Sequence, residues 1–207
     1  MTYPCSVCTT WRPGLLADVQ IRHLAEVHGM IRPFEPKARR KNNRGDPCLS
    51  FGCGSFGYDA RVQPKWKVFT PRGRNVVLDP KNIDPLAFED VQGLSVDIPP
   101  NGFVLAVSIE EMHIPDDVMA TVYTKSSYAR AGISMQLTPL EPGWRGFVTV
   151  EIGNTTPHWS RVYAEEGLMQ ILFQKGSMPC ERTYANKNDG QASKYQNQGP
   201  EIVLPRM

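Results

Sequence analysis

Hydroxyl and cationic side chains gather in the segment TKSSYARAG, Thr124 to Gly132. Their hydrogen-bond donors follow the apolar run VMATVY, and they suit a polyphosphate held at a turn after a strand. A turn exposed to water can have the same composition, so the segment alone leaves both interpretations open. The residues concerned are Lys125, Ser126, Ser127 and Arg130.

A glutamate occurs inside a predicted strand of the segment LEPGWRGFVTVEIGN, Leu140 to Asn154. Because successive side chains of a strand point to opposite faces, Glu151 and Thr149 share one face and Val150 lies on the other. A glutamate in a strand usually faces solvent, and one that is buried usually serves a purpose. Partial burial would raise the pKa of Glu151 toward neutrality, which suits a group that gives and takes protons.

A third polar segment, SKYQNQGP, runs from Ser193 to Pro200. Its amides and Lys194 are typical of a loop that closes over a polar ligand. The segment belongs to a carboxyl-terminal tail, about residues 184–207, which is rich in Asn, Gln, Lys and Gly. We expect this tail to be mobile until a ligand orders it.

A Cys-x-x-Cys pair lies near the amino terminus, in PCSVC. Zinc-dependent nucleobase deaminases use this spacing together with a His-x-Glu, which supplies the third ligand and the proton shuttle. None of the four histidines is followed two positions later by Glu, so that mechanism is excluded. A structural site of four thiolates stays open beside the alternative of reduced thiols in a cytosolic chain. Those thiolates would be Cys5, Cys8, Cys48 and Cys53.

One helix and many short strands must position these segments. The periodicity of residues 17–30 predicts a helix that ends near Gly29. After it, short β-branched and aromatic runs separated by Pro, Gly, Asn and Asp predict a β-barrel or sandwich. The basic stretch KARRKNNR, residues 37–44, is expected to be a solvated loop. The apolar helix face is expected to contain Val19, Ile21, Leu24, Ala25 and Val27.

The length of 207 residues suits one domain, and we expect residues 1–16 to be an extension of a domain that spans 17–207. A net charge of +2 is too small to argue for a nucleic-acid partner. No segment approaches the roughly 20 apolar residues of a membrane span. A cytoplasmic location is expected.

Together and in this order, these segments resemble the deoxycytidine triphosphate (dCTP) deaminases, members of the trimeric deoxyuridine triphosphatase (dUTPase) superfamily. The resemblance runs from DVQIRHLAEVHGM through SFGYDARV, KSSYARAGI and EPGWRGFVTVEIG to KYQNQGP. It leaves out only about the first sixteen residues. It implies a mainly β protein, a distorted jelly-roll (dUTPase-like) barrel with an amino-terminal helix, assembled as a homotrimer with active sites between subunits.

The resemblance also implies roles for single residues. Glu151 would donate and accept protons, and Ser126 would help position the attacking water. Arg130 would orient the Glu151 carboxylate and the water. Magnesium would enter only on the triphosphate and no zinc would be required. The product would be dUTP, and deoxythymidine triphosphate (dTTP) a possible inhibitor. The substrate contacts would be Lys125, Ser126, Ser127, Tyr128, Ala129, Arg130, Glu141, Thr149, Val150, Gln170, Tyr184, Lys194 and Gln198.

Several alternatives stay open. A dUTPase would use an acid at the position of Glu141, and a bifunctional deaminase and dUTPase would keep both Glu141 and Glu151. Thr124 stands where the family commonly has Gly, and Gln136 where Asn is frequent, so the substrate could be a modified dCTP. A nucleotide-binding regulator without activity would have no need of Glu151.

Overall fold

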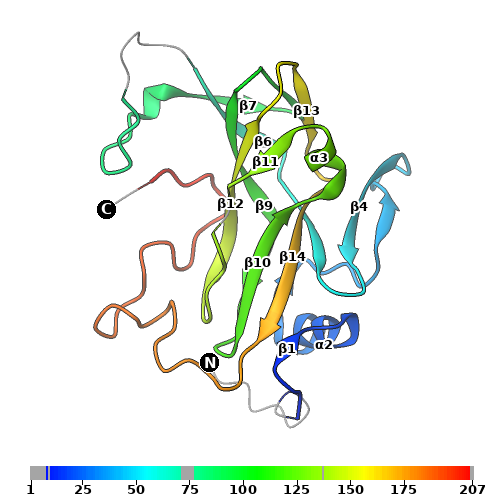
Figure 1. The fold of residues 1–207 in the computed structure, drawn as a ribbon, viewed down its shortest axis with the longest axis vertical. Coiled ribbons are helices and arrows are strands. Elements are labelled where there is room, and N and C mark those ends of the chain that lie inside the picture. The colour runs from blue at the N-terminus through cyan, green and yellow to red at the C-terminus, as the bar shows by residue number, and fades with distance from the viewer. Residues whose placement is uncertain (1–7, 9, 71–76, 137, 206–207) are drawn as a thin grey trace.

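The computed structural model describes residue 8 and residues 10–70, 77–136 and 138–205. Two six-stranded, antiparallel sheets and one two-stranded sheet make up most of this part of the chain (Figure 1). The first large sheet has the order β1-β14-β5-β4-β3, with β10 also paired to β14. Its strands are Gly14–Leu15 (β1), Gly167–Lys175 (β14), Tyr58–Arg61 (β5), Pro47–Cys53 (β4), Arg39–Lys41 (β3) and Val118–Thr124 (β10).

The second large sheet has the order β11-β12-β9-β6-β7, with β2 also paired to β9. Its strands are Ile133–Met135 (β11), Arg145–Asn154 (β12), Phe103–His113 (β9), Lys65–Phe69 (β6), Phe88–Gln92 (β7) and Ile31–Arg32 (β2). The small sheet pairs Ser95–Ile98 (β8) with Ser160–Tyr163 (β13), and a 3-10 turn, Pro85–Ala87 (η1), precedes β7. The predicted mainly β class with a helix at the front is confirmed.

The predicted helix is present as α2, Asp18–His28. It ends at Gly29, whose left-handed φ of 67° is a conformation that glycine adopts at no steric cost. Ile21, Leu24 and Ala25 are buried, as expected. The prediction was wrong for Val19 and Val27, both 62% exposed, because they lie outside the arc of the helix that faces the sheet.

The structure adds detail to one expectation about the first part of the chain and corrects another. The described residues before α2 include a strand, β1, which pairs with β14, and the side chains of Cys8 and Leu16 are buried. This part of the expected extension is therefore packed against the domain. The basic stretch of residues 37–44 is not only a loop, because β3 lies within it and pairs with β4.

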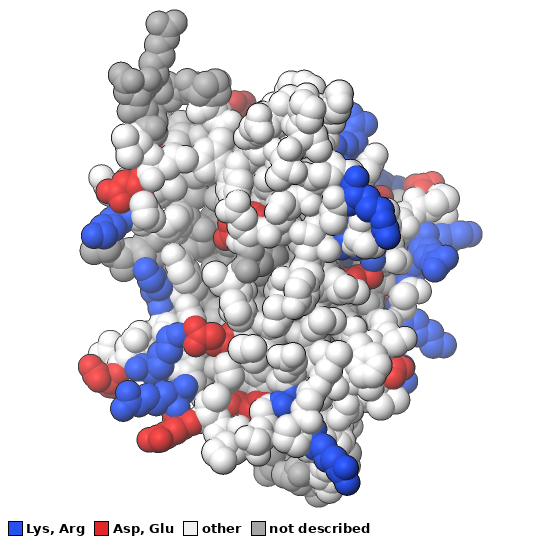
Figure 2. Space-filling view, in the orientation of Figure 1, with Lys and Arg blue, Asp and Glu red and all other residues white. Residues whose placement is uncertain are grey.

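Charged side chains of both signs lie interspersed along the edges of the face seen in Figure 2, and its centre is largely uncharged. No helix among the described residues is both long and apolar enough to span a membrane.

Candidate active site

Glu151 lies in the middle of β12, opposite Leu105 of β9. Side chains of β12 alternate between buried and half-buried positions, as predicted, and Val150 is completely buried on the core face. Val150 can therefore offer only its backbone to a ligand on the Glu151 face. Burial raises the pKa of Glu151 from 4.5 to about 7, and the hydrogen bond from its own backbone amide lowers it only in part.

The Glu151 face forms the floor of a pocket of about 1020 Å³. Phe69, Phe88 and Phe103 form an aromatic group at one side, where the ring centroids of Phe69 and Phe88 are 4.4 Å apart and those of Phe69 and Phe103 are 5.1 Å apart. A pocket with apolar walls and a few polar groups is typical of a site for a small organic ligand. Six residues expected at the site line it: Glu141, Thr149, Glu151, Tyr184, Lys194 and Gln198.

The carboxyl-terminal tail brings half of these residues to the pocket. Gln198 is buried, and its Nε2 donates to Thr149 Oγ1 at 2.6 Å and to the carbonyl oxygen of Phe147 at 2.8 Å. The backbone amide of Phe147 donates to the carbonyl oxygen of Gln198 at 2.9 Å. The tail therefore lies along the first half of β12, the part that β11 leaves uncovered.

Sequence reasoning missed Lys187. Its Nζ contacts both carboxylate oxygens of Glu141, at 2.6 and 2.7 Å, and lies 4.7 Å from the centroid of the Tyr184 ring. All three side chains line the pocket. Lys187 follows Tyr184 by three residues in the segment CERTYANK, which was noted only as part of the family resemblance.

A bulge in β9 shapes the strand pair that carries Glu151. Three residues of β9, Ser108 to Glu110, stand opposite the single residue Val148 of β12. The Ser108 hydroxyl donates to the carbonyl oxygen of Glu110 at 2.7 Å and accepts from the amide of Val148 at 2.8 Å. Bulges of this kind re-aim side chains and are common beside active sites. This one lies three residues from Glu151.

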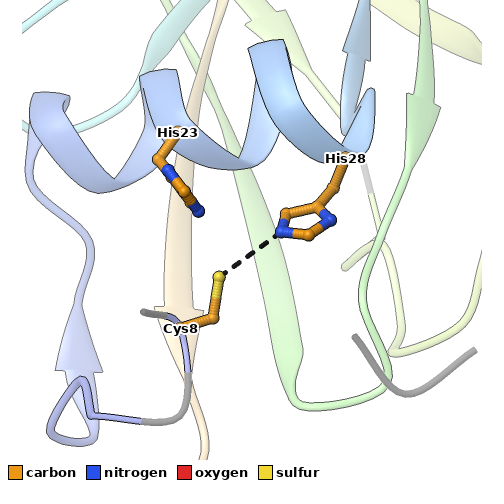
Figure 3. Close-up of side chains that lie close together, drawn as sticks. All are labelled: Cys8, His23 and His28. Carbon is orange, nitrogen blue, oxygen red and sulfur yellow. Dashed lines mark hydrogen bonds between the residues drawn. The ribbon is translucent and has the colours of Figure 1, made fainter. Parts of the chain in front are cut away.

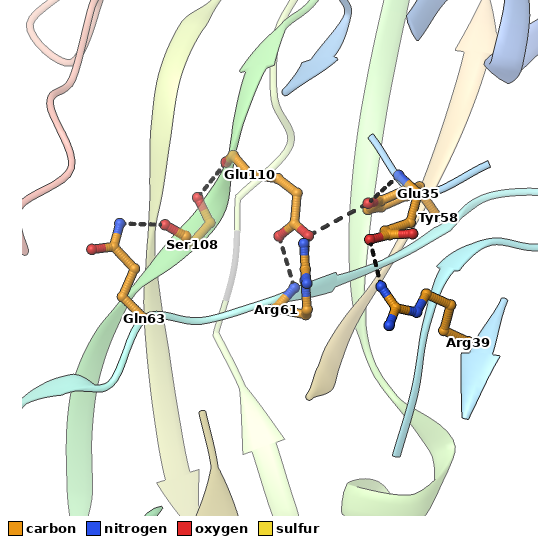
Figure 4. Close-up of polar contacts among 7 residues, drawn as sticks. All are labelled: Glu35, Arg39, Tyr58, Arg61, Gln63, Ser108 and Glu110. Carbon is orange, nitrogen blue, oxygen red and sulfur yellow. Dashed lines mark hydrogen bonds and ion pairs between the residues drawn. The ribbon is translucent and has the colours of Figure 1, made fainter. Parts of the chain in front are cut away.

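A buried ion pair holds the far side of the bulge (Figure 4). The carboxylate of Glu110, which is fully buried, accepts from Arg61 Nε at 2.8 Å and from the Arg61 amide at 2.9 Å. Burial raises the pKa of Glu110, and the Arg61 guanidinium opposes that rise. Because both charges are paired, the group serves to anchor β9 to β5.

The segment Thr124 to Gly132 is not a simple turn. Residues Ser126–Arg130 form a short helix, α3, directly after β10. Ser126, Ser127, Ala129 and Arg130 are exposed, whereas Tyr128 is buried and its hydroxyl accepts from the amide of Tyr163 at 3.0 Å.

Lys125 is only partly exposed, because its Nζ is paired with Asp59 Oδ2. Asp59 of β5 lies beside Gln170 of β14, which is exposed. The other carboxylate oxygen of Asp59 is buried and has no hydrogen-bond partner among the described residues. Asp59 is a second residue that sequence reasoning did not single out.

One chain does not bring all of the expected site residues together. Neither residues 125–130 nor Gln170 line the Glu151 pocket. In Figure 1 the tail lies to the left of β12 and α3 lies to the right of it. Most of the expected residues thus form two groups: a Glu151 group around the pocket, and an α3 group made of residues 125–130 and Gln170. The exposed members of the α3 group are Ser126, Ser127, Ala129, Arg130 and Gln170.

The two departures from the family pattern have structural roles. The Thr124 hydroxyl accepts from the amide of Met135 at 3.0 Å, which ties the end of β10 to β11. The amide of Gln136 donates to the backbone carbonyl oxygen of Glu151 at 3.0 Å, and its side chain is exposed.

The hypothesis of four thiolates is not supported. Among the described residues, the potential metal ligands that gather near Cys8 are His23 and His28, and neither Cys48 nor Cys53 joins them. Cys5 lies outside the described residues.

The fold and the pocket define a mainly β protein with a half-buried acid at the floor of a binding site. Residues 15–176 match the sequence model of the dCTP deaminase-like family. The chain is 49% identical to a dCTP deaminase of Chloroflexus aggregans over 191 residues, 92% of this chain and 97% of that protein. It is 44% identical to a dCTP deaminase of Methylacidiphilum infernorum over 194 residues, 94% of this chain and 100% of that protein.

A similar fold occurs in the crystal structure of 2'-deoxycytidine 5'-triphosphate deaminase from Agrobacterium tumefaciens, with a TM-score of 0.56 at 20% identity. The likeness covers 79% of this chain and 48% of that chain. The chain therefore belongs to the dCTP deaminase-like family.

Proposed function

We propose that this protein hydrolyses the exocyclic amine of dCTP, giving dUTP and ammonia. The observation that carries the proposal is Glu151, a half-buried carboxyl with a pKa raised to about 7 at the floor of the pocket. Near neutral pH such a group exists in both protonation states, so it can accept a proton and return it.

Glu151 is assigned every proton transfer of the reaction. It takes a proton from water as the oxygen adds to carbon 4 of cytosine, and it passes that proton to ring nitrogen 3. It then takes the proton of the new hydroxyl on carbon 4 and delivers it to the amine, so the carbon–nitrogen bond breaks, ammonia leaves and the carbonyl group of uracil forms. The aromatic group of the pocket suits the base, and Thr149 and Gln198, which line the same pocket, are assigned contacts to the nucleotide.

The α3 group is assigned the triphosphate and the attacking water, supplied by a neighbouring subunit. The support is that Ser126, Ser127 and Arg130 are exposed and outside the Glu151 pocket of their own chain. Exposed Trp159 and Tyr163 offer apolar surface for packing between subunits. We infer a homotrimer of jelly-roll barrels, in which each site joins the two groups from adjacent chains.

Magnesium is expected to arrive on the triphosphate, since it usually keeps phosphate oxygens and waters as ligands. The described residues contain no group of three acidic side chains that would hold it alone. No step is assigned to zinc. Polarisation of the water falls to Ser126 and backbone groups.

A dUTPase activity would need Glu141 as its base. Both acids line the same pocket, but Lys187 engages both oxygens of Glu141. Glu151 has no ion pair among the described residues, so the proton transfers are assigned to it.

The test is incubation of the protein with dCTP and Mg²⁺, followed by ammonia measurement and chromatographic separation of nucleotides. Equal amounts of ammonia and dUTP are expected. Ammonia together with dUMP would identify the bifunctional enzyme. Pyrophosphate release from dUTP without any ammonia from dCTP would contradict deamination. Parallel reactions with base-modified dCTP would show whether such a substrate is preferred.

A further inference from the structure

Three potential metal ligands converge beside α2, away from the active site. His23 and His28 project from the same side of the helix toward Cys8 (Figure 3). One ligand atom of each residue lies within 4.8 Å of the other two. The sulfur of Cys8 and Nε2 of His28 are 3.6 Å apart. None of the three lines the Glu151 pocket.

The distance of 3.6 Å between the Cys8 sulfur and His28 Nε2 suits a shared zinc ion. In a tetrahedral site with Zn–S of about 2.3 Å and Zn–N of about 2.0 Å, sulfur and nitrogen are about 3.5 Å apart. A hydrogen bond between Cys8 and His28 would explain that one distance. The His23 ring also packs edge to face on Trp11 and on His28, and one shared ion would engage the ligand atoms of all three residues at a single point.

The spacing of Cys and His residues in the sequence also indicates a zinc site. Cys5 and Cys8 are separated by two residues, Cys8 and His23 by fourteen, and His23 and His28 by four. A Cys-x-x-Cys pair followed at this range by His-x₃₋₅-His is a ligand pattern of structural zinc sites.

The surroundings are those of a structural site rather than a catalytic one. Cys8 is 6% exposed and belongs to the hydrophobic core, and the Trp11 ring contacts His23 edge to face with centroids 5.5 Å apart. The apolar surroundings thus keep water mainly from the Cys8 sulfur, whereas His23 and His28 are half-buried. The family match begins at residue 15, after Cys8.

We propose that Cys8, His23 and His28 bind a structural zinc ion that fastens the amino-terminal segment to α2. Binding would replace the thiol proton of Cys8 by the metal, and it would stabilise the folded chain because the unfolded chain has no preformed site. Deamination would not pass through this ion.

Metal content is the first test. Protein without a histidine tag should carry about one zinc per chain after gel filtration, measured by mass spectrometry of the metal. Cys8→Ser and His28→Gln should lose most of that zinc. Cys180→Ser and His158→Gln, which change exposed residues elsewhere, should keep it. Equal zinc in all five proteins, or none in the parent even after zinc is supplied, overturns the proposal.

A second readout does not depend on how the variants fold. Cobalt added to the zinc-free parent should produce the near-ultraviolet charge-transfer absorption of a thiolate bound to cobalt. Zinc should abolish that absorption by displacement, and the melting temperature should rise with either metal. Absence of the absorption at saturating cobalt means that Cys8 is not a ligand.

Discussion

Glu151 lies where a strand of the core sheet meets an open pocket, so its side chain is partly removed from water without an ionic partner among the described residues. Burial disfavours the charged form of a carboxyl, and this is the cause of its raised pKa. On a strand exposed to water, a glutamate at this position would keep the ordinary pKa of its carboxyl group. The chemistry assigned to Glu151 therefore depends on its surroundings.

Glu151→Gln should abolish most deamination. Glutamine keeps the size and hydrogen-bonding capacity of the side chain but cannot transfer protons, so dCTP should still bind while kcat falls by about 10³-fold or more. Ammonia release and calorimetric dCTP binding measure the two effects.

Glu141→Gln is the matched comparison. It breaks the contact with Lys187 but removes no proton-transfer group, so ammonia release should fall much less than in Glu151→Gln. Deamination by Glu151→Gln at near the parental rate would mean that another residue performs the proton transfers.

Glu151 should also make stability depend on pH. Because its pKa in the folded protein, about 7, lies above the ordinary 4.5, the folded state keeps this proton to higher pH than the unfolded chain does. The stability it contributes is full below pH 4.5 and is lost as pH rises to about 7.

Glu151→Gln lacks this loss. Between about pH 5 and about pH 8, the free energy of unfolding of the parent should therefore fall relative to that of Glu151→Gln, by at most about 3 kcal/mol. Urea unfolding at fixed protein concentration measures the difference. A constant difference across that range would mean that Glu151 is not buried in solution.

At the scale of elements, the bulge in β9 sets the geometry of the strand that carries Glu151. The hydroxyl of Ser108 satisfies the amide of Val148, which would otherwise be buried without a partner. At the bulge, one side-chain hydrogen bond therefore replaces the backbone hydrogen bond that regular strand pairing would give Val148.

Ser108→Ala should destabilise the protein by about 1–3 kcal/mol, the cost of a buried polar group left unsatisfied. Ser134→Ala, an exposed serine of the same sheet, should change stability by less than about 0.5 kcal/mol. Thermal unfolding of both variants measures the two changes in stability. A neutral Ser108→Ala would show that water or a shift of the bulge satisfies Val148.

The tail acts as a second element of the site, joined to β12 through Gln198. Gln198→Ala should loosen it, so that proteolysis in residues 184–205 becomes faster and the KM for dCTP rises by about tenfold with a smaller change in kcat. Gln191→Ala, at an exposed position of the same tail, should resemble the parent. Equal proteolysis of the two variants would contradict a tail held by Gln198.

For the whole molecule, the proposed site is divided between chains. Arg130→Ala and Glu151→Gln should each be inactive, because each removes one group from every site. Co-expressed in equal amounts, they should form mixed trimers in which about a quarter of the sites combine an intact Glu151 with an intact Arg130. Sedimentation analysis should show trimers in every preparation.

The comparison is ammonia release by the mixture and by each variant alone. Recovery of activity is expected only when the two groups come from different subunits. A mixture as inactive as its components, with trimers present, would place both groups of one site in the same chain.

Local patterns determined much of this protein from the sequence alone. Period-two alternation placed Glu151 opposite the core face of β12, and the 3.6-residue period with Gly29 placed α2 and its end, because these features depend on backbone geometry within one element. The ordered motifs implied the dCTP deaminase-like family, which the family match confirms.

Only the tertiary structure decided which distant residues meet. Lys187 joins Glu141 from 46 residues away, and Cys8 meets His28 from 20 residues away, because chain reversals and sheet pairing bring them together. The burial that raises the pKa of Glu151 likewise comes from the pocket walls and the tail. Strand periodicity could place this side chain on a face, but the amount of water left on that face depends on everything packed above it.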